Sequence, residues 1–178
     1  MKILAAIVTH NRCELLERCI NHLQEQTRLP DSILVVNNGS TDATVDMLMR
    51  RNIQHITQEN LGSAGGWNRC ISHALEHHFD AIWLMDDDGF PDPSALERLE
   101  SNLDTDTACV SSVVLREKDR DRLVFPFPVL NNKKLPVIFS LRHKLKTIKK
   151  VLSVCPGGLY PFANFFNGAL VSTDAIKK

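Results

Sequence analysis

Short apolar runs recur through the first ninety residues, and each one ends in a polar loop. They are Ile3–Val8, Ser32–Val36, a shorter run within residues 52–58, and Ala81–Met85. A continuous apolar run of this length is typical of a strand that is buried on both faces. Apolar residues at helical spacing predict helices over Cys13–Gln26, from Thr41 or Asp42 to about Met49, and from about Ala64 to His78. This alternation predicts an α/β fold with a mostly parallel sheet, flanked by helices and connected by right-handed crossovers.

Three polar motifs follow three of these predicted strands. They are THNR at residues 9–12, NNGSTD at 37–42 and DDDG at 86–89. In an open parallel sheet, ligands bind outside the carboxyl ends of the strands. We therefore expect side chains that are far apart in the sequence to meet in one crevice.

The pattern becomes less regular after residue 90. Pro93 and Ser94 open a predicted helix, and TACVSSVVL at 107–115 is typical of a strand. The Pro-rich stretch 125–136 predicts an irregular connection, and Ile138–Leu152 carries apolar residues at helical spacing. The chain closes with a predicted strand and the start of a helix at Asp174. No repeat or linker is evident, so we expect a single domain over residues 1–178.

The formal net charge of zero conceals two oppositely charged parts. Residues 1–121 contain 11 Lys and Arg against 20 Asp and Glu, whereas residues 122–178 contain 10 against one. Such asymmetry favours either two parts that face each other or a basic surface for an anionic partner. The basic face of the predicted helix 138–152 suggests peripheral contact with an anionic membrane or a lipid-phosphate acceptor. A packed helix with a solvated face is the alternative, and we expect no nucleic-acid partner.

The five cysteines are scattered and form no C-x-x-C pair, which argues against a disulfide framework and against a zinc site. The amino-terminal apolar run is too short for a signal peptide. No segment approaches the roughly 20 apolar residues that span a bilayer. These features predict a cytoplasmic protein.

Three consecutive carboxylates, Asp86, Asp87 and Asp88, follow the apolar strand AIWLM. Carboxylates at a strand end supply the hard oxygen ligands that Mg²⁺ and Mn²⁺ prefer. Because strand side chains alternate, we expect Asp86 and Asp88 to share one side and to bind the metal, while Asp87 lies on the other side and supports the turn. A solvated acidic turn that caps the next helix is the alternative.

Three glycines within five residues, Gly62, Gly65 and Gly66, stand at the opening of a predicted helix. Glycine lets backbone N–H groups approach an anion at a helix amino terminus. The segment matches neither the phosphate loop nor the dinucleotide fingerprint, so a flexible turn stays open as the alternative.

Four segments occur in a characteristic order: AAIVTHNR, ILVVNNGSTD, ENLGSAGGWNRC and IWLMDDDGFPDP. Together they resemble the nucleotide-binding half of inverting family-2 glycosyltransferases of the GT-A (Rossmann-like) fold. The resemblance is strong over 1–99 and, through FFNGALVS, reaches the chain end more weakly. NLGSAGGWNR is most similar to the galactofuranosyltransferase branch, followed by rhamnosyltransferases. The resemblance implies a nucleotide-sugar-binding half at 1–99 and an incomplete acceptor-side half at 100–178.

The resemblance also implies which residues hold the donor. Asn37 stands where the family usually has an aspartate that contacts uracil or ribose, which leaves the base undetermined. Asp86 and Asp88 match the family's D-x-D, whose second carboxylate ligates the metal. Trp67 and Phe90 are candidates for contact with sugar or base, or for the core. The implied nucleotide-sugar contacts are Thr9, Asn11, Arg12, Asn37, Asn38, Gly39, Gly62, Gly65, Gly66, Asn68, Arg69, Asp86 and Asp87.

On the acceptor side, Phe166, Asn167 and Gly168 resemble the family's acceptor-side turn. The family's catalytic base is an Asp or Glu in a segment shortly after the following strand. Asp174 is the only carboxylate after Asp121, and its place at the start of a predicted helix does not suit that role. We therefore expect the base beyond Lys178, in a longer enzyme of which this chain is a truncated version.

The implied function is transfer of a sugar with inversion and with Mn²⁺ or Mg²⁺, from a nucleotide-sugar donor to a polysaccharide or glycolipid acceptor. The implied donor is UDP-linked, with galactofuranose as one candidate sugar. The implied location is the cytoplasm, with the inner face of the plasma membrane as one candidate position. A dTDP-rhamnose-dependent rhamnosyltransferase and a nucleotide-sugar-binding module without turnover stay open as alternatives. A nucleotidyltransferase ranks last, because VTHNR lacks the glycine expected after its first strand.

Overall fold

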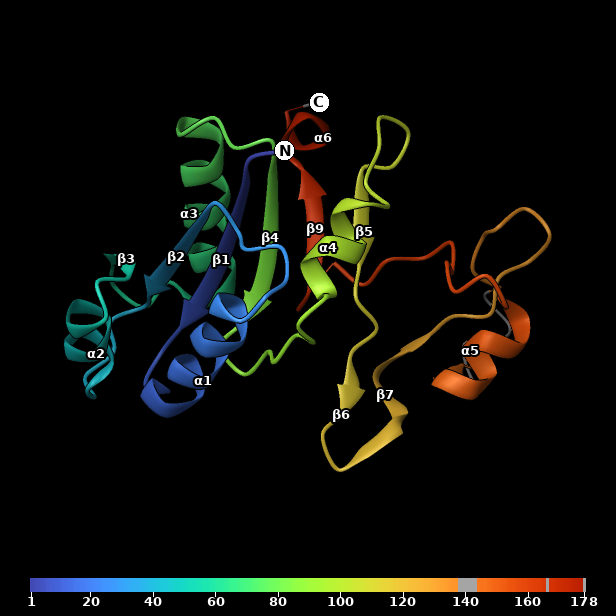
Figure 1. The fold of residues 1–178 in the computed structure, drawn as a ribbon, viewed down its shortest axis with the longest axis horizontal. Helices are drawn as coiled ribbons and strands as arrows, with labels where there is room; N and C mark the ends of the chain where they lie inside the picture. Colours follow the sequence, from blue (N-terminus) through green and yellow to red (C-terminus); the bar gives the residue numbers. More distant parts are fainter. Residues whose placement is uncertain (138–143, 166, 178) are drawn as a thin grey trace. The chain divides into compact units, whose positions relative to one another are not determined.

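The computed structural model describes residues 1–137, 144–165 and 167–177 of the chain. The chain divides into two compact units, which are described separately (Figure 1). Unit 1 comprises Met1–Ser112 and Phe165–Lys178, and unit 2 comprises Val113–Asn164. Within the part of the chain that the structure describes, no helix is both long and apolar enough to cross a membrane.

Unit 1 is built on a mixed six-stranded sheet with the order β3-β2-β1-β4-β9-β5. Its strands are β1 (Ile3–Thr9), β2 (Ser32–Asn37), β3 (Gln54–Thr57), β4 (Ala81–Asp86), β5 (Cys109–Ser111) and β9 (Ala169–Ser172). β1 pairs in parallel with β2 and β4, so that Thr9 lies opposite Asn37 and Val8 lies opposite Asp86. β9 is antiparallel to both of its neighbours. The predicted mostly parallel sheet is confirmed.

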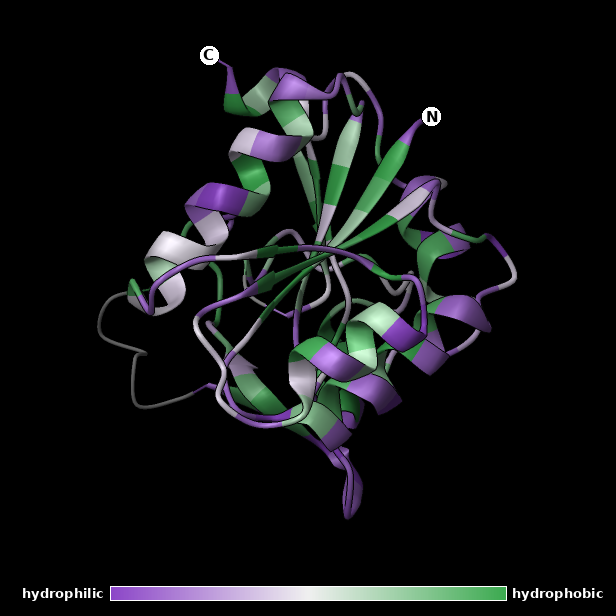
Figure 2. Cartoon of the chain, turned by 90° about the vertical axis from the view of Figure 1, so that its left-hand side faces the viewer, coloured by the Kyte–Doolittle hydropathy of each residue, from purple (hydrophilic) through white to green (hydrophobic). Residues whose placement is uncertain are grey.

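Helices cover both faces of this sheet (Figure 1). They are α1 (Cys13–Gln24), α2 (Thr44–Arg50), α3 (Gly62–Glu76), α4 (Ala95–Glu100) and α6 (Thr173–Ile176). Ile3 and Ile7 of β1 belong to an apolar cluster with α1, α2 and α4, whereas Leu4 and Ala6 belong to a cluster with α3. This division follows from the period of two along a strand. Figure 2 shows the strands as mostly hydrophobic, between helices that carry both kinds of residue.

Unit 2 contains a small antiparallel sheet with the order β6-β7-β8 and one short helix. The elements are β6 (Leu115–Arg116), β7 (Asp119–Phe127), β8 (Leu145–Thr147) and α5 (Ile148–Val154). Its small core consists of Leu123, Phe127, Leu145 and Val151. Tyr160 stacks on Phe127 with ring centroids 5.4 Å apart, and its hydroxyl donates to the Pro128 carbonyl over 2.6 Å.

Two of the predicted elements are wrong in unit 2. The helix expected over Ile138–Leu152 is wrong at Leu145–Thr147, which form β8, and α5 begins only at Ile148. Leu145 is buried opposite Phe127, and the Thr147 hydroxyl caps α5 by accepting from the Lys150 N–H over 3.4 Å. Residues 138–143 of that prediction lie outside the described residues. The irregular connection expected over 125–136 is wrong at its start, because β7 continues to Phe127.

Candidate functional site

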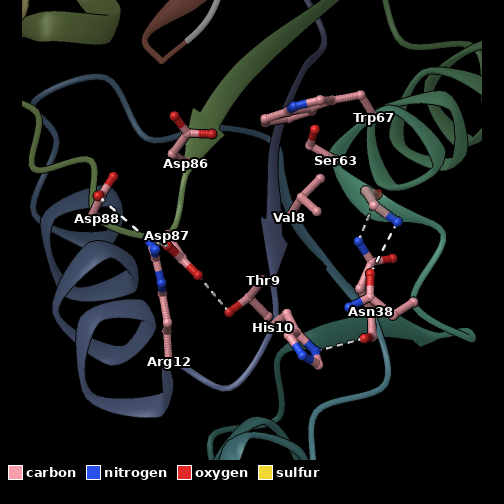
Figure 3. A pocket seen from close by; sticks show the side chains of 12 residues that line it. Val8, Thr9, His10, Arg12, Asn38, Ser63, Trp67, Asp86, Asp87 and Asp88 are labelled. Carbon is pink, nitrogen blue, oxygen red and sulfur yellow. Dashed lines mark hydrogen bonds and ion pairs between the residues drawn. The ribbon is translucent and has the colours of Figure 1, made fainter.

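The carboxyl ends of β1, β2 and β4 and the start of α3 surround one pocket of about 410 Å³ (Figure 3). A volume in this range is typical of small-molecule sites. The expected convergence of the three strand-end motifs is therefore observed. The residues that line the pocket are Val8, Thr9, His10, Arg12, Asn38, Asn60, Gly62, Ser63, Trp67, Asp86, Asp87 and Asp88.

The Asp turn, residues 86–89, begins at the last residue of β4. The Gly89 N–H donates to the Asp86 carbonyl over 2.9 Å and closes the turn. A Cβ atom at Gly89 would lie 2.6 Å from both Asn167 Oδ1 and Met85 Cγ, so only glycine fits without displacement. Asn167, a predicted acceptor-side residue, thus lies directly beside the Asp turn. Gly168 follows it at φ +91° and donates its N–H to the Leu84 carbonyl over 2.7 Å.

Asp87 supports the turn, as expected, but it does so from inside the pocket. Its Oδ2 accepts a 2.8 Å hydrogen bond from Thr9 Oγ1, and its Oδ1 accepts a 3.1 Å bond from Arg12 Nη1 (Figure 3). The same Arg12 nitrogen lies 3.7 Å from Asp88 Oδ2. The expectation that Asp87 lies on the other side from Asp86 and Asp88 is therefore wrong. The chain turns directly after Asp86, so strand alternation no longer applies.

The three carboxylates are crowded, and the pKa values of Asp86 and Asp87 respond to their surroundings. Burial, followed by the charges of Asp88 and Asp87, raises the pKa of Asp86. Burial also raises the pKa of Asp87, and this effect outweighs the hydrogen bonds from Thr9 and Arg12, which lower the pKa. The hydrogen bond and charge of Asp87 in turn raise the pKa of Arg12. Three carboxylates face one guanidinium, so the pocket has an excess of negative charge that suits a cation.

Asp86 and Asp88 fit a divalent cation that arrives with a diphosphate. Among the described residues, none donates a hydrogen bond to the half-buried Asp86 carboxylate, and Asp88 is exposed. No group of three or more His, Cys, Asp or Glu residues in the described ranges is arranged to hold a metal by itself. Mg²⁺ sites commonly need only one or two carboxylates, because substrate phosphates and water complete the coordination.

The glycines of α3 let this helix approach the strand ends closely. A Cβ atom at Gly66 would lie 2.4 Å from Val8 Cγ1, and Gly62 has a φ of +71° at the helix start. Asn38 ties the same region to β2, because its Nδ2 donates to the Gly62 carbonyl over 3.0 Å. Gly66 therefore acts through packing, whereas Gly62 is the one of the three glycines that lines the pocket.

Several residues of the predicted donor site do not line the pocket. Asn37 is fully buried, where its Oδ1 accepts from the Ser40 N–H over 3.0 Å and its Nδ2 lies 3.4 Å from Thr57 Oγ1. Asn11 Oδ1 accepts from the Thr41 N–H over 2.7 Å. Both amides thus build the loops at the strand ends. The predicted contacts outside the lining are Asn11, Asn37, Gly39, Gly65, Gly66, Asn68 and Arg69. Phe166 lies outside the described residues.

The two aromatic candidates differ in position. Trp67 lines the pocket and also packs against the apolar cluster of α3, whereas Phe90 packs on the opposite face of the sheet. The guanidinium of Arg18 stands 3.8 Å above the Phe90 ring. Phe90 is therefore a packing residue in this structure. Trp67 is still a candidate for contact with sugar or base as well as for packing in the core.

Sequence reasoning missed four lining residues: Val8, His10, Asn60 and Ser63. His10 Nδ1 lies 2.8 Å from the Asn38 carbonyl oxygen, which links the ends of β1 and β2. Val8 and His10 lie at the end of β1, and Asn60 and Ser63 lie within two residues of Gly62, at the start of α3. Their position beside the motifs was the available signal, and residue type alone did not distinguish them.

Comparisons with known proteins show the family and the fold. The chain is 34% identical over 180 residues to the galactofuranosyltransferase GlfT1 of Mycolicibacterium smegmatis, covering 98% of this chain and 57% of that protein. The chain thus spans little more than half the length of this curated relative.

Two solved structures share the fold. S. aureus TarS 1-349 matches with a TM-score of 0.63 and 15% identity over 99% of this chain and 48% of that one. Glucosyl-3-phosphoglycerate synthase from Mycobacterium tuberculosis, in complex with Mn²⁺ and UDP-glucose, matches with a TM-score of 0.59 and 16% identity over 97% of this chain and 56% of that one. The expected GT-A fold is confirmed. The family model "Glycosyl transferase family 2" matches residues 5–162, and the chain therefore belongs to glycosyl transferase family 2.

Proposed function

We propose that the pocket binds a nucleotide sugar, with UDP-galactofuranose as the favoured donor, and serves an inverting, metal-assisted glycosyl transfer. This proposal rests on one observation: three carboxylates, Arg12 and the start of α3 all line one pocket of about 410 Å³. The likeness to a galactofuranosyltransferase at 34% identity favours that donor. The solved complex of a fold relative with Mn²⁺ and UDP-glucose supports the use of a metal and of uridine.

The proposed roles follow the positions of the side chains. Asp86 and Asp88 would hold Mn²⁺ or Mg²⁺, which when bound would neutralise charge on the departing diphosphate. Thr9 and Asp87 hold the Asp turn in place, and Arg12 faces the pocket as the available cation. The donor contacts proposed from the lining residues are Thr9, Arg12, Asn38, Gly62, Asp86 and Asp87.

The transfer itself needs an acceptor hydroxyl and a base. The hydroxyl oxygen forms a bond to the anomeric carbon as the bond from that carbon to the diphosphate oxygen breaks, and the hydroxyl proton passes to the base. We propose Phe166, Asn167 and Gly168 for the acceptor side, since Asn167 lies beside the Asp turn. We assign no residue of the described ranges as the base, and we propose 1–99 as the donor half and 100–178 as the acceptor half.

The proposed acceptor is a polysaccharide or glycolipid, met at the inner face of the plasma membrane. The five free thiols suit a reducing compartment such as the cytoplasm. We propose the basic segment 138–152 for peripheral membrane contact; its described basic residues, all exposed, are Lys144, Lys146, Lys149 and Lys150.

The test is a thermal-shift screen of the chain against UDP-, dTDP- and GDP-sugars with Mn²⁺, because a ligand that binds only the folded state raises the melting temperature. We expect stabilisation by UDP-galactofuranose above all. A preference for dTDP-rhamnose would favour a rhamnosyltransferase. Binding without UDP release in the presence of acceptors would favour a module without turnover, and no stabilisation by any nucleotide sugar would overturn the proposal.

A further inference from the structure

We propose that Arg12 is a positioning residue that serves as an exchangeable counter-cation for the Asp turn. Without a donor, its guanidinium pairs with both Asp87 and Asp88. When the nucleotide arrives with its cation, Arg12 keeps Asp87, releases Asp88 and directs its remaining N–H groups to the diphosphate. This inference rests on the proposed function, and it predicts that cation and nucleotide strengthen each other's binding.

The two contacts of Arg12 differ in strength, which decides which one exchanges. Asp87 accepts a 3.1 Å hydrogen bond from Arg12 Nη1, its side chain is only 6% exposed, and Thr9 holds its other oxygen. Asp88 lies 3.7 Å from the same nitrogen, and its side chain is 48% exposed. An exposed ion pair at this distance contributes little stability, whereas a charged hydrogen bond to a buried carboxylate is costly to break. Asp88 is therefore the carboxylate that Arg12 can release.

The position of Arg12 makes it a competitor for the cation. Arg12 stands at the N-cap of α1 with its side chain 52% exposed, so the guanidinium can move without disturbing the core. A divalent cation on Asp88 would share that carboxylate with a guanidinium of like charge, which weakens binding of the cation alone. A diphosphate adds negative charge and can accept two parallel hydrogen bonds from the planar guanidinium. Arg12 can then bind the diphosphate, and it no longer competes with the divalent cation for Asp88.

The experiment is calorimetry of the chain with Mn²⁺ alone, and with UDP at saturating Mn²⁺, for wild type, Arg12→Gln and Arg12→Lys. Removing a unit charge near the site should strengthen binding of Mn²⁺ alone by about threefold to tenfold. The same variant should bind UDP with Mn²⁺ about tenfold or more weakly, since the charged contact to the diphosphate is lost. Arg12→Lys should bind Mn²⁺ alone like the wild type.

Arg51→Gln is the matched control, because Arg51 pairs with Glu17 outside the pocket and its loss changes the net charge equally. This control should leave both affinities unchanged. If Arg12→Gln binds Mn²⁺ alone no better than wild type, or worse, Arg12 only supports the turn and the inference is overturned.

A second measurement uses the wild type alone and does not depend on the folding of a variant. UDP should raise the affinity for Mn²⁺ at least about tenfold, and Mn²⁺ should raise the affinity for UDP by the same factor, as reciprocal coupling requires. Independent binding of the two ligands overturns the inference, and with it the proposed contact between the cation and the diphosphate, whereas the nucleotide pocket itself stands. No binding of UDP by the wild type under any condition overturns the proposed function instead.

Discussion

Thr9 Oγ1 donates a 2.8 Å hydrogen bond to Asp87 Oδ2 and thereby joins the last residue of β1 to the middle of the Asp turn. Both residues are buried, Thr9 at 2% and Asp87 at 4% exposure. A buried carboxylate depends on each hydrogen bond that it accepts, because water is excluded from it. The Thr9 hydroxyl is therefore expected to position the carboxylates that we propose for the donor site.

Replacing Thr9 by valine tests this dependence. Thr9→Val keeps the shape of the side chain but leaves one Asp87 oxygen without its donor, which should lower the free energy of unfolding by ~1–3 kcal/mol. Urea denaturation measures the loss, and Thr9→Ser, which retains the hydroxyl, should lose less. Equal stability of Thr9→Val and wild type would show that the bond contributes nothing.

The close approach of α3 to β1 predicts a cost for any side chain at Gly66. A Cβ atom there would lie 2.4 Å from Val8 Cγ1 and 3.1 Å from Asn38 Nδ2. Gly66→Ala should therefore destabilise the protein by ~1–3 kcal/mol through overpacking, and it should displace two residues that line the pocket. Gly157→Ala is the control, because nothing lies within 4 Å of its Cβ position. Comparable melting temperatures for the two variants would contradict the packing role.

The raised pKa of Asp86 predicts how the site responds to acid. Burial, with the charges of Asp88 and Asp87, places this pKa above the ordinary value of 3.8, so the ionised carboxylate costs folding free energy near neutral pH. That cost is relieved as the pH falls through the raised pKa, and a bound cation relieves it at neutral pH.

Mn²⁺ with UDP should consequently raise the melting temperature more at about pH 7.5 than at about pH 5, because the raised pKa of Asp86 makes its carboxylate easier to protonate as the pH falls. Differential scanning calorimetry at both values measures the difference. Asp86→Asn should reduce this pH dependence. The same increment at both values, in the wild type, would argue that ionised Asp86 plays no part in binding the ligand.

The central strands β1, β2 and β4 of unit 1 were predictable because each contains a continuous apolar run. Ile3, Ile7 and Leu4 pack as that pattern requires, on two covered faces. Unit 2 was harder, since Leu145 and Ile148 satisfy helical spacing although they belong to β8 and α5. Thr147, a residue type that favours the N-cap, was the readable sign of the break between them.

The site was predictable at the level of strand ends but less so at the level of single side chains. Asp86 and Asp88 line the pocket as expected, because the buried strand β4 ends at Asp86 and the turn that follows carries Asp88. Asn37 does not, since hydrogen bonds with Ser40 and Thr57 occupy its amide. Contacts between residues far apart in the sequence decide whether a polar side chain faces the pocket or stabilises a loop. The spacing of residues along the chain does not reveal these contacts.

The most direct test of the proposed donor site is calorimetry of UDP with Mn²⁺ on wild type, Asp86→Asn and Asp88→Asn. Asp106→Asn, an exposed residue outside the pocket, is the control for the loss of one negative charge. We predict that wild type and the control bind alike, and that each pocket variant loses at least about tenfold in affinity, since even the partners of metal ligands contribute ~10–100-fold. Equal affinity of all four proteins for UDP in the presence of Mn²⁺ would contradict the account.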